Sequence, residues 1–61
     1  MDYKRWLSPL DIYKELGISK STQAKMRMKR IIPFLKIGRF VRYDRLEINE
    51  WLEQNKVVTI K

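Results

Sequence analysis

The sequence predicts a mainly α-helical fold with a small β-hairpin, arranged as a single domain. A chain of 61 residues can bury only one small core. Three patterns indicate the elements: two capped helices joined by a glycine turn, two short apolar runs around Gly38, and an acidic cap before a last apolar stripe. We expect the core in residues 6–54, followed by a tail at 55–61 that is flexible, adds a strand or meets another protomer.

The first helix is expected at about residues 9–16. Ser8 offers a side-chain acceptor to the first turn, and Pro9 fits the first helical position, where a missing N–H costs nothing. Gly17 can adopt the left-handed conformation that ends a helix. The apolar stripe that we expect to be buried contains Ile12, Tyr13 and Leu16.

A second helix is expected from Lys20 to about Lys29, with Ser19 as its cap. The turn between the two helices is then three residues long and contains a glycine. A helix, a short glycine turn and a basic second helix are typical of helix-turn-helix DNA-binding domains, which place the second helix in the major groove. A helical hairpin of a structural bundle shares the pattern, but the charge of the second helix disfavours that alternative.

The second helix has two sides in this interpretation. Thr22 and Met26 fall on the side facing the first helix, whereas cations and small residues fall on the outward side, where they can approach DNA. Gln23 flanks the outward side, and its carboxamide can pair with adenine if it points outward. The candidate DNA-binding residues of this helix and its cap are Ser19, Lys20, Ser21, Thr22, Gln23, Ala24, Lys25, Arg27 and Met28.

A β-hairpin is expected after Pro33, because two short runs with alternating apolar residues follow it. A two-residue turn at the tip would place Arg42 opposite Leu35 on an apolar face. A three-residue loop at 38–40 keeps Arg42 off the apolar face. The predicted cross-strand pairs are therefore Ile37 with Val41 and Leu35 with Tyr43.

In this register Lys36 and Arg42 share the other face of the hairpin. Two like charges side by side are unfavourable unless an anion lies opposite them. We therefore interpret the hairpin as a wing that contacts the DNA backbone or the minor groove, with an ordinary charged edge strand as the alternative. The candidate DNA-binding residues of the wing are Lys36, Gly38, Arg39, Phe40 and Arg42.

A third helix is expected at about residues 45–54. Asp44 and Glu47 have the spacing of a capping box. Trp51 is expected to be the main apolar anchor, with Ile48 and Leu52 completing its stripe. The outer side carries three acids that a phosphate backbone would repel, so we expect it to face away from DNA: Glu47, Glu50 and Glu53.

Positive charge is concentrated in the middle of the chain, whose net charge is +7. Residues 1–19 are neutral, residues 46–61 carry a net −1, and residues 20–45 hold nine Lys or Arg side chains against one Asp. A face that only solubilises a protein usually mixes both signs. The basic middle therefore favours a surface that binds a polyanion.

The composition argues against several other classes of function. The chain has no Cys and no His, which removes disulfides, thiolates and the usual transition-metal ligands. Its acids fall on expected caps and outer faces and do not converge on a nucleophile and base, so we expect neither an enzyme nor a cofactor or small-molecule ligand. We also expect no membrane association and a cytoplasmic location, because no apolar run approaches the ~20 residues of a membrane span and no signal peptide is visible.

The order of these motifs resembles the small winged helix-turn-helix proteins of the excisionase and AlpA-like phage regulator group, which are related to the DNA-binding domain of MerR-type regulators. The resemblance runs from Trp6 to Leu52 and rests on these pieces: Leu7-Ser8-Pro9, Leu16-Gly17-Ile18-Ser19-Lys20-Ser21-Thr22, Pro33, Lys36-Ile37-Gly38-Arg39, Val41-Arg42-Tyr43, Ile48 and Trp51-Leu52. It implies a second helix in the major groove and a wing in the adjacent minor groove. Two positions depart from the pattern: Gln23 replaces an apolar residue, which would place it at a helix interface, and Arg30 replaces a glycine.

The expected function is sequence-specific binding of double-stranded DNA by a protein of bacterial or phage origin. The resemblance implies an excisionase or a transcription regulator of a phage or mobile element, acting with an integrase or with other copies of itself on adjacent sites. The alternative is a protein-interaction adaptor or inhibitor that uses its basic face on an acidic or nucleic-acid-processing partner. RNA binding is a weaker possibility, because we expect the aromatic residues to be buried and not arrayed for base stacking.

Overall fold

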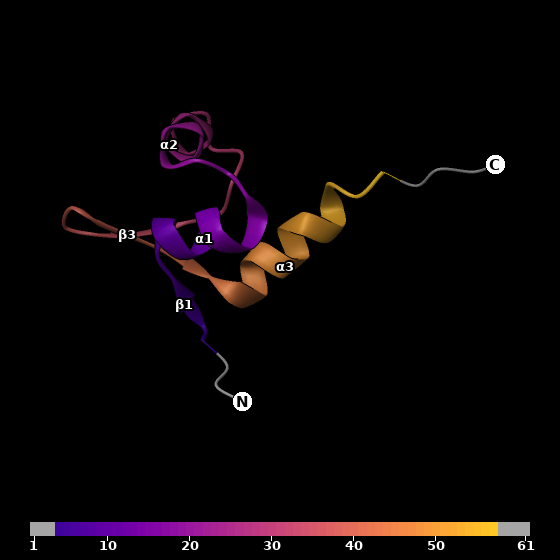
Figure 1. The fold of residues 1–61 in the computed structure, drawn as a ribbon, viewed down its shortest axis with the longest axis horizontal. Helices are drawn as coiled ribbons and strands as arrows, with labels where there is room; N and C mark the ends of the chain where they lie inside the picture. Colours follow the sequence, from indigo (N-terminus) through magenta and orange to yellow (C-terminus); the bar gives the residue numbers. More distant parts are fainter. Residues whose placement is uncertain (1–3, 58–61) are drawn as a thin grey trace.

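The computed structural model describes residues 4–57, and within them it contains three helices and one antiparallel sheet (Figure 1). The elements are β1 (Trp6–Leu7), α1 (Pro9–Leu16), α2 (Lys20–Met28), β2 (Leu35–Ile37), β3 (Phe40–Asp44) and α3 (Arg45–Gln54). The strand order is β1-β3-β2. The mainly α fold class with a small hairpin is confirmed, and α1, α2 and α3 occupy the predicted positions.

The first two helices begin and end where the sequence signals predict. The Ser8 hydroxyl accepts a hydrogen bond from the Asp11 N–H at 3.2 Å, and the Asp11 carboxylate accepts one from the Ser8 N–H at 2.9 Å, which completes a capping box. Gly17 ends α1 with φ 73°, in the left-handed region. Ser19 then caps α2 by accepting from the Thr22 N–H at 3.2 Å. The short turn therefore fixes both helix ends.

Helix α2 ends in a Schellman motif built around an arginine. Arg30 has φ 56°, and it is the one non-glycine residue with positive φ in the described chain. The Ile31 N–H donates to the Met26 carbonyl at 3.0 Å and the Arg30 N–H donates to the Arg27 carbonyl at 3.0 Å. These are the two bonds of the motif, which normally has glycine at the left-handed position. Arg30 therefore adopts the geometry of the glycine that it replaces.

The hairpin has a two-residue turn, so the predicted three-residue loop is wrong. Its cross-strand pairs are Ile37 with Phe40, Lys36 with Val41, and Leu35 with Arg42. Gly38 supplies a positive φ of 59° at the first turn position, as a type II′ turn requires. The prediction failed because it required Leu35 and Ile37 to be buried, whereas they are 42% and 60% exposed.

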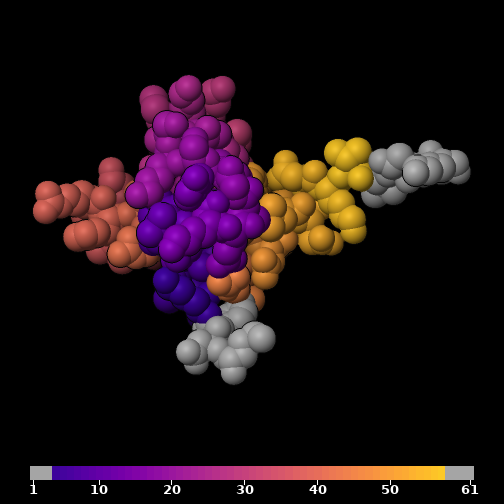
Figure 2. All heavy atoms as spheres, viewed as in Figure 1, coloured from indigo at the N-terminus to yellow at the C-terminus, as the bar shows by residue number. Residues whose placement is uncertain are grey.

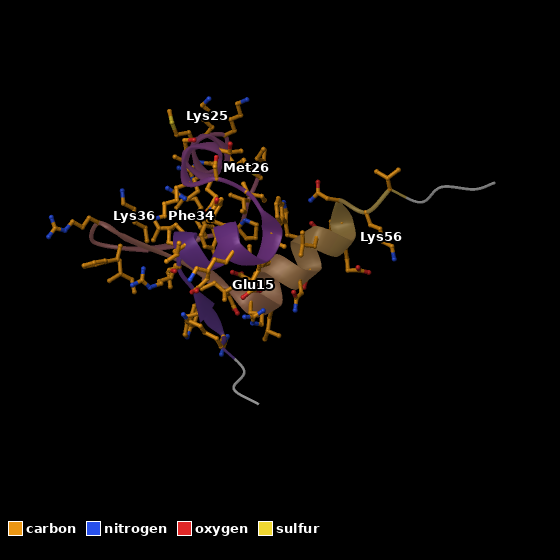
Figure 3. The ribbon with its side chains drawn as sticks, in the orientation of Figure 1. Glu15, Lys25, Met26, Phe34, Lys36 and Lys56 are labelled. Atoms are coloured by element: carbon orange, nitrogen blue, oxygen red, sulfur yellow. The ribbon has the colours of Figure 1, made fainter. Side chains whose placement is uncertain are left out.

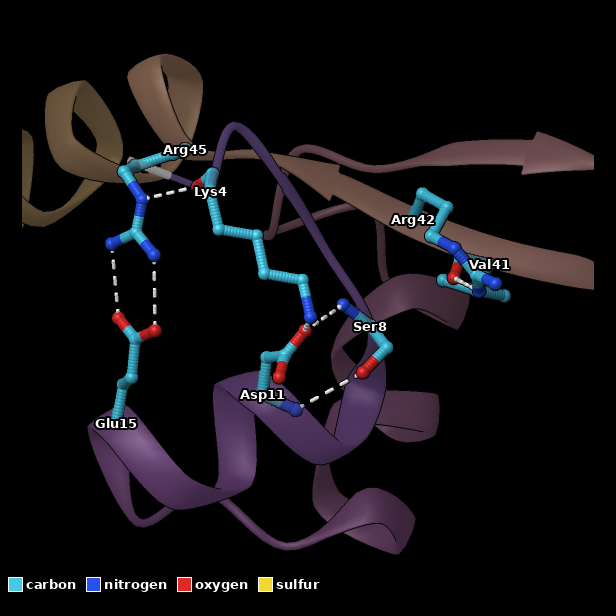
Figure 4. Close-up of polar contacts among 7 residues, drawn as sticks. All are labelled: Lys4, Ser8, Asp11, Glu15, Val41, Arg42 and Arg45. Carbon is cyan, nitrogen blue, oxygen red and sulfur yellow. Dashed lines mark hydrogen bonds and ion pairs between the residues drawn. The ribbon is translucent and has the colours of Figure 1, made fainter. Parts of the chain in front are cut away.

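A third strand, β1, was not predicted and pairs with β3 on the side away from β2. The residues just before β1 interact with the junction of β3 and α3 through arginine side chains, and Figure 4 shows the contacts of Arg45. Arg45 Nε donates to the Lys4 carbonyl at 2.6 Å, and its guanidinium binds Glu15 of α1 through two bonds of 3.1 Å. Arg5 forms an ion pair with Asp44 at 3.3 Å. The N-terminal strand therefore joins α1, β3 and α3.

The core lies where α1, α3 and the inner face of the sheet meet. Its buried side chains are Leu7, Ile12, Ile32, Tyr43 and Ile48. Three predictions about the core are wrong: Tyr13 is 51% exposed, Leu52 is 37% exposed, and Trp51 is only partly buried against the cluster. Tyr43, which is fully buried, is the largest anchor instead.

The space-filling view shows three lobes around the central α1 (Figure 2). Helix α2 forms the upper lobe, the hairpin of β2 and β3 extends to the left, and α3 extends to the right. No helix within residues 4–57 is long and apolar enough to cross a membrane. In the predicted tail, Val57 is 84% exposed, and residues 58–61 lie outside the described residues.

Candidate nucleic-acid interface

The outward face of α2 presents most of the predicted DNA-binding side chains to solvent. Lys25 projects from the top of the helix, away from the core (Figure 3). Met28 is 83% exposed, so its sulfur packs against no core. Ser19 lies at the cap, where its hydroxyl donates to Thr22 Oγ1 at 2.9 Å. The remaining exposed members of the predicted set are Lys20, Ser21 and Thr22, so the expectation that Thr22 faces α1 is wrong.

Gln23 is excluded from this face because it is fully buried. Its Nε2 donates to the carbonyls of Pro9 and Ile18, each at 2.9 Å, and its Oε1 accepts from the Tyr43 hydroxyl at 2.9 Å. A direct contact with adenine is therefore not available to this side chain. The alternative that the resemblance implied, a position at the helix interface, is the one observed. A glutamine fits there because every polar atom of its amide has a partner.

A groove of about 450 Å³ separates α2 from the hairpin. The residues that line it are Ala24, Arg27 and Met28 from α2 and Phe34, Lys36, Arg39 and Val41 from the hairpin and its approach. Three of these side chains are cationic and none is acidic. Like charges around one groove repel one another unless an anion lies among them. The groove therefore has the electrostatic character of an anion-binding site.

The wing divides its five predicted residues between the tip and the two faces of the hairpin. Gly38, Arg39 and Phe40 are exposed at the tip, and Lys36 projects on the side of α2 (Figure 3). The prediction that Lys36 and Arg42 share a face is wrong, because the observed register alternates them. Arg42 lies on the opposite face, where its guanidinium carbon is 5.8 Å from the centroid of the Phe40 ring and its Nη1 donates to the Val41 carbonyl.

That opposite face of the sheet is more aromatic than expected. Trp6 is 45% exposed and Phe40 is 58% exposed, and the Arg5 guanidinium carbon lies 4.9 Å from the centroid of the Trp6 ring. The expectation that the aromatic residues are buried is therefore wrong for Trp6 and Tyr13, whereas Phe40 was expected at the exposed wing. Leu35 and Ile37 share the face. Single arginines shield the rings through cation–π contacts.

Asp11 of α1 and Asp44, at the junction of β3 and α3, form their ion pairs outside the groove. A hydrogen bond from Lys4 and the backbone N–H of Ser8 hold the pKa of Asp11 at about 2, below its ordinary 3.8. Hydrogen bonds from Arg5 lower the pKa of Asp44, which also accepts from the Leu46 N–H at the start of α3. These carboxylates therefore neutralise cations at the N-terminal side and leave those of the groove unbalanced.

Sequence reasoning missed three residues that shape the interface. Phe34 and Val41 line the groove with apolar side chains, and Tyr43 joins the hairpin to α2 by accepting from Arg27 Nη1 at 2.6 Å. The alternation of the true register would have placed Val41 and Tyr43 on one face with Lys36. The signal was present in the Gly38-Arg39 pair, which suits a two-residue turn.

A capped helix, a three-residue turn and a second helix with a β-hairpin beside it define a winged helix-turn-helix protein, a class that binds double-stranded DNA. The family model of the helix-turn-helix domain matches residues 6–56. The chain therefore belongs to the helix-turn-helix domain family, and its class of activity is DNA binding. Searches of curated proteins and of solved structures gave no match.

Proposed function

We propose that this chain reads a specific sequence in double-stranded DNA and serves a phage or another mobile element as an excisionase or as a transcription regulator. One observation carries the proposal: a groove lined by three cations lies between an exposed, polar helix face and an exposed hairpin tip. A phosphate backbone fits such a groove while α2 occupies the major groove beside it. The excisionase-like order of sequence motifs supports the mobile-element role.

Two features support a purely binding role with protein partners on DNA. Asp11, Glu15 and Asp44 are each held in an ion pair or helix cap, so we propose no catalytic step for them. The exposed apolar face of Trp6 and Phe40 provides a surface for contacts with an integrase or with another copy on an adjacent site.

The proposal is tested by selecting bound sites from a random duplex library at physiological salt with excess nonspecific competitor. We expect enrichment of one short motif, present as repeats if copies act together. Binding without enrichment would contradict sequence-specific reading. Failure to bind duplex DNA, together with tight binding to an acidic protein, would favour the adaptor alternative.

A circular-permutation bending assay on the selected site separates the two roles. An excisionase should bend DNA and shift an integrase reaction toward excision, whereas a regulator should occupy a promoter and change transcription with no effect on recombination. Lack of both effects on a specific site would contradict the mobile-element role while leaving DNA reading intact.

The proposed surface is tested with two charge-matched double variants. Lys25→Ala/Lys36→Ala removes one cation from α2 and one from the wing (Figure 3). Lys14→Ala/Lys56→Ala removes one exposed cation from α1 and one from the segment after α3. Each lost phosphate contact should lower the salt slope by about 0.9. We expect the first variant to weaken binding at least about tenfold and the second to bind nearly as the wild type does. Equal losses would place the interface elsewhere.

A further inference from the structure

A chain of directional hydrogen bonds begins at the buried amide of Gln23. Its Nε2 donates to the carbonyls of Pro9 and Ile18, and only the nitrogen end of an amide can donate. These two carbonyls, one at the start of α1 and one in the turn, therefore fix which way the amide points. Its Oε1 must face Tyr43 on the wing. The orientation follows from the partners and needs no further assumption.

The polarity of the Tyr43 hydroxyl follows from this arrangement. Its single proton is donated to Gln23 Oε1 at 2.9 Å, so in any further hydrogen bond the hydroxyl oxygen can only accept. The donor that it accepts from is Arg27 Nη1, at 2.6 Å. Tyr43 is fully buried and cannot follow a moving side chain. The hydroxyl thus holds one edge of the Arg27 guanidinium at a fixed place.

Arg27 has donors left for a ligand. A guanidinium carries five N–H groups, and among residues 4–57 the Tyr43 hydroxyl is its one hydrogen-bond partner. The side chain lines the groove that Lys36 and Arg39 line from the wing. An arginine that is already held loses less conformational entropy when it binds an anion than a free one does.

We propose that Arg27 seats a DNA backbone phosphate in the groove between α2 and the wing, and that Gln23 and Tyr43 are positioning residues that hold its guanidinium for this contact. The inference rests on the proposed DNA-binding function, and it distinguishes one arginine held by a buried partner from the exposed cations Lys36 and Arg39 of the same groove. A phosphate contact carries no base information, so the effect of Arg27 should be the same on any duplex.

The test is a double-mutant cycle with wild type, Arg27→Met, Tyr43→Phe and the double variant. Affinity for a selected duplex and for a scrambled one is measured across a salt series, and each variant is melted to confirm folding. Arg27→Met should weaken binding about tenfold on both duplexes and make the salt slope shallower by about 0.9. Tyr43→Phe keeps every charge, so it should weaken binding about threefold with an unchanged slope.

The decisive comparison is the effect of Tyr43→Phe in the Arg27→Met background. If the hydroxyl acts through Arg27, the second substitution causes no further loss of affinity. Tyr13→Phe, which removes a hydroxyl from a half-exposed ring on α1, is the matched control and should bind as the wild type does. An equal loss in both backgrounds would show that Tyr43 acts only on the fold, and would overturn the inference.

Other outcomes are equally clear. A loss confined to the selected duplex would make Arg27 a base reader and overturn the phosphate assignment, and so would an unchanged salt slope in Arg27→Met. Absence of wild-type binding to any duplex would overturn the proposed function as well.

If Tyr43→Phe does not fold, NMR of the wild-type protein tests the hydrogen bond between Arg27 and Tyr43. A slowly exchanging Arg27 Nη1 proton near the Tyr43 ring would support the bond. Arg27 signals averaged by rotation, like those of the exposed Arg39, would overturn it.

Discussion

Arg30 is an L-residue in a conformation that glycine adopts without strain. The left-handed region costs a side-chain-bearing residue about 1–2 kcal/mol, because Cβ crowds the carbonyl oxygen. The chain accepts this cost at the end of α2, where the two bonds of the Schellman motif turn the backbone toward Ile32 in the core. The strained conformation therefore places a cation directly after the end of α2.

Replacing Arg30 by glycine should therefore stabilise the fold. Relief of strain is offset in part by the larger backbone entropy of glycine in the unfolded chain, so we expect the free energy of unfolding to rise by about 0.5–1 kcal/mol. Arg30→Ala removes the same charge but keeps Cβ, and it should not gain this stability. Thermal or urea unfolding of both variants measures the difference. Equal stability of the two variants would contradict the strain argument.

Asp11 makes the fold sensitive to acid. Its pKa is about 2 in the folded chain and about 3.8 when unfolded, so its stabilising contribution is complete above the unfolded value and is lost as the pH falls from about 4 to about 2. Solvent screening limits the contribution to about 1 kcal/mol. Asp11→Asn should lower stability at pH 7 and flatten the acid loss in this range, measured by unfolding at pH 7 and pH 2. Glu53→Gln, a change at an exposed acid of α3, serves as the control, and an unaltered acid profile in Asp11→Asn would contradict the assignment.

At the scale of elements, local signals placed the helices well and the hairpin register poorly. The caps at Ser8 and Ser19 and the stop at Gly17 act within a few residues, so they are readable from the sequence. The register depends on which face of the hairpin the rest of the fold covers, and the helices that pack against β3 are α1 and α3. Leu35 was predicted to be buried because it is apolar. Its exposure depends on which elements pack against the hairpin, and the local sequence does not show this.

Helix α3 offers a direct test of the revised core. Ile48 is 3% exposed, whereas Trp51, the expected anchor, is only partly buried. We expect Ile48→Ala to cost about 2–4 kcal/mol of unfolding free energy. Leu52→Ala, at a more exposed position of the same helix, should cost less than about 1 kcal/mol. Chemical denaturation measures both, and a larger loss for Leu52→Ala would refute the core as described.

At the scale of the whole molecule, the charge map can be read from the sequence without knowledge of the fold. Summed charge does not depend on the register of a strand, and three cations of the basic middle at 20–45 line the groove between α2 and the wing. The burial of Gln23 and the path of β1 could not be derived, because each depends on partners far along the chain. The partner of Gln23 on the wing is 20 residues away.

The affinity for duplex DNA should fall steeply with salt. Five to seven phosphate contacts correspond to a slope of log affinity against log salt of about −4 to −6. Fluorescence anisotropy on one duplex between low and physiological salt gives the slope. A value near zero would show that the basic surface does not meet a phosphate backbone.

The layout of α2 also bears on how such a protein changes over generations. Its buried positions, Gln23 and the partly buried Met26, hold the helix to the body, while Lys20, Ser21 and Lys25 stand free of the core. Substitutions at free surface positions usually alter stability by no more than about 0.5 kcal/mol. Under the proposed function, a lineage can therefore exchange these side chains and change the DNA sequence that is bound without rebuilding the core.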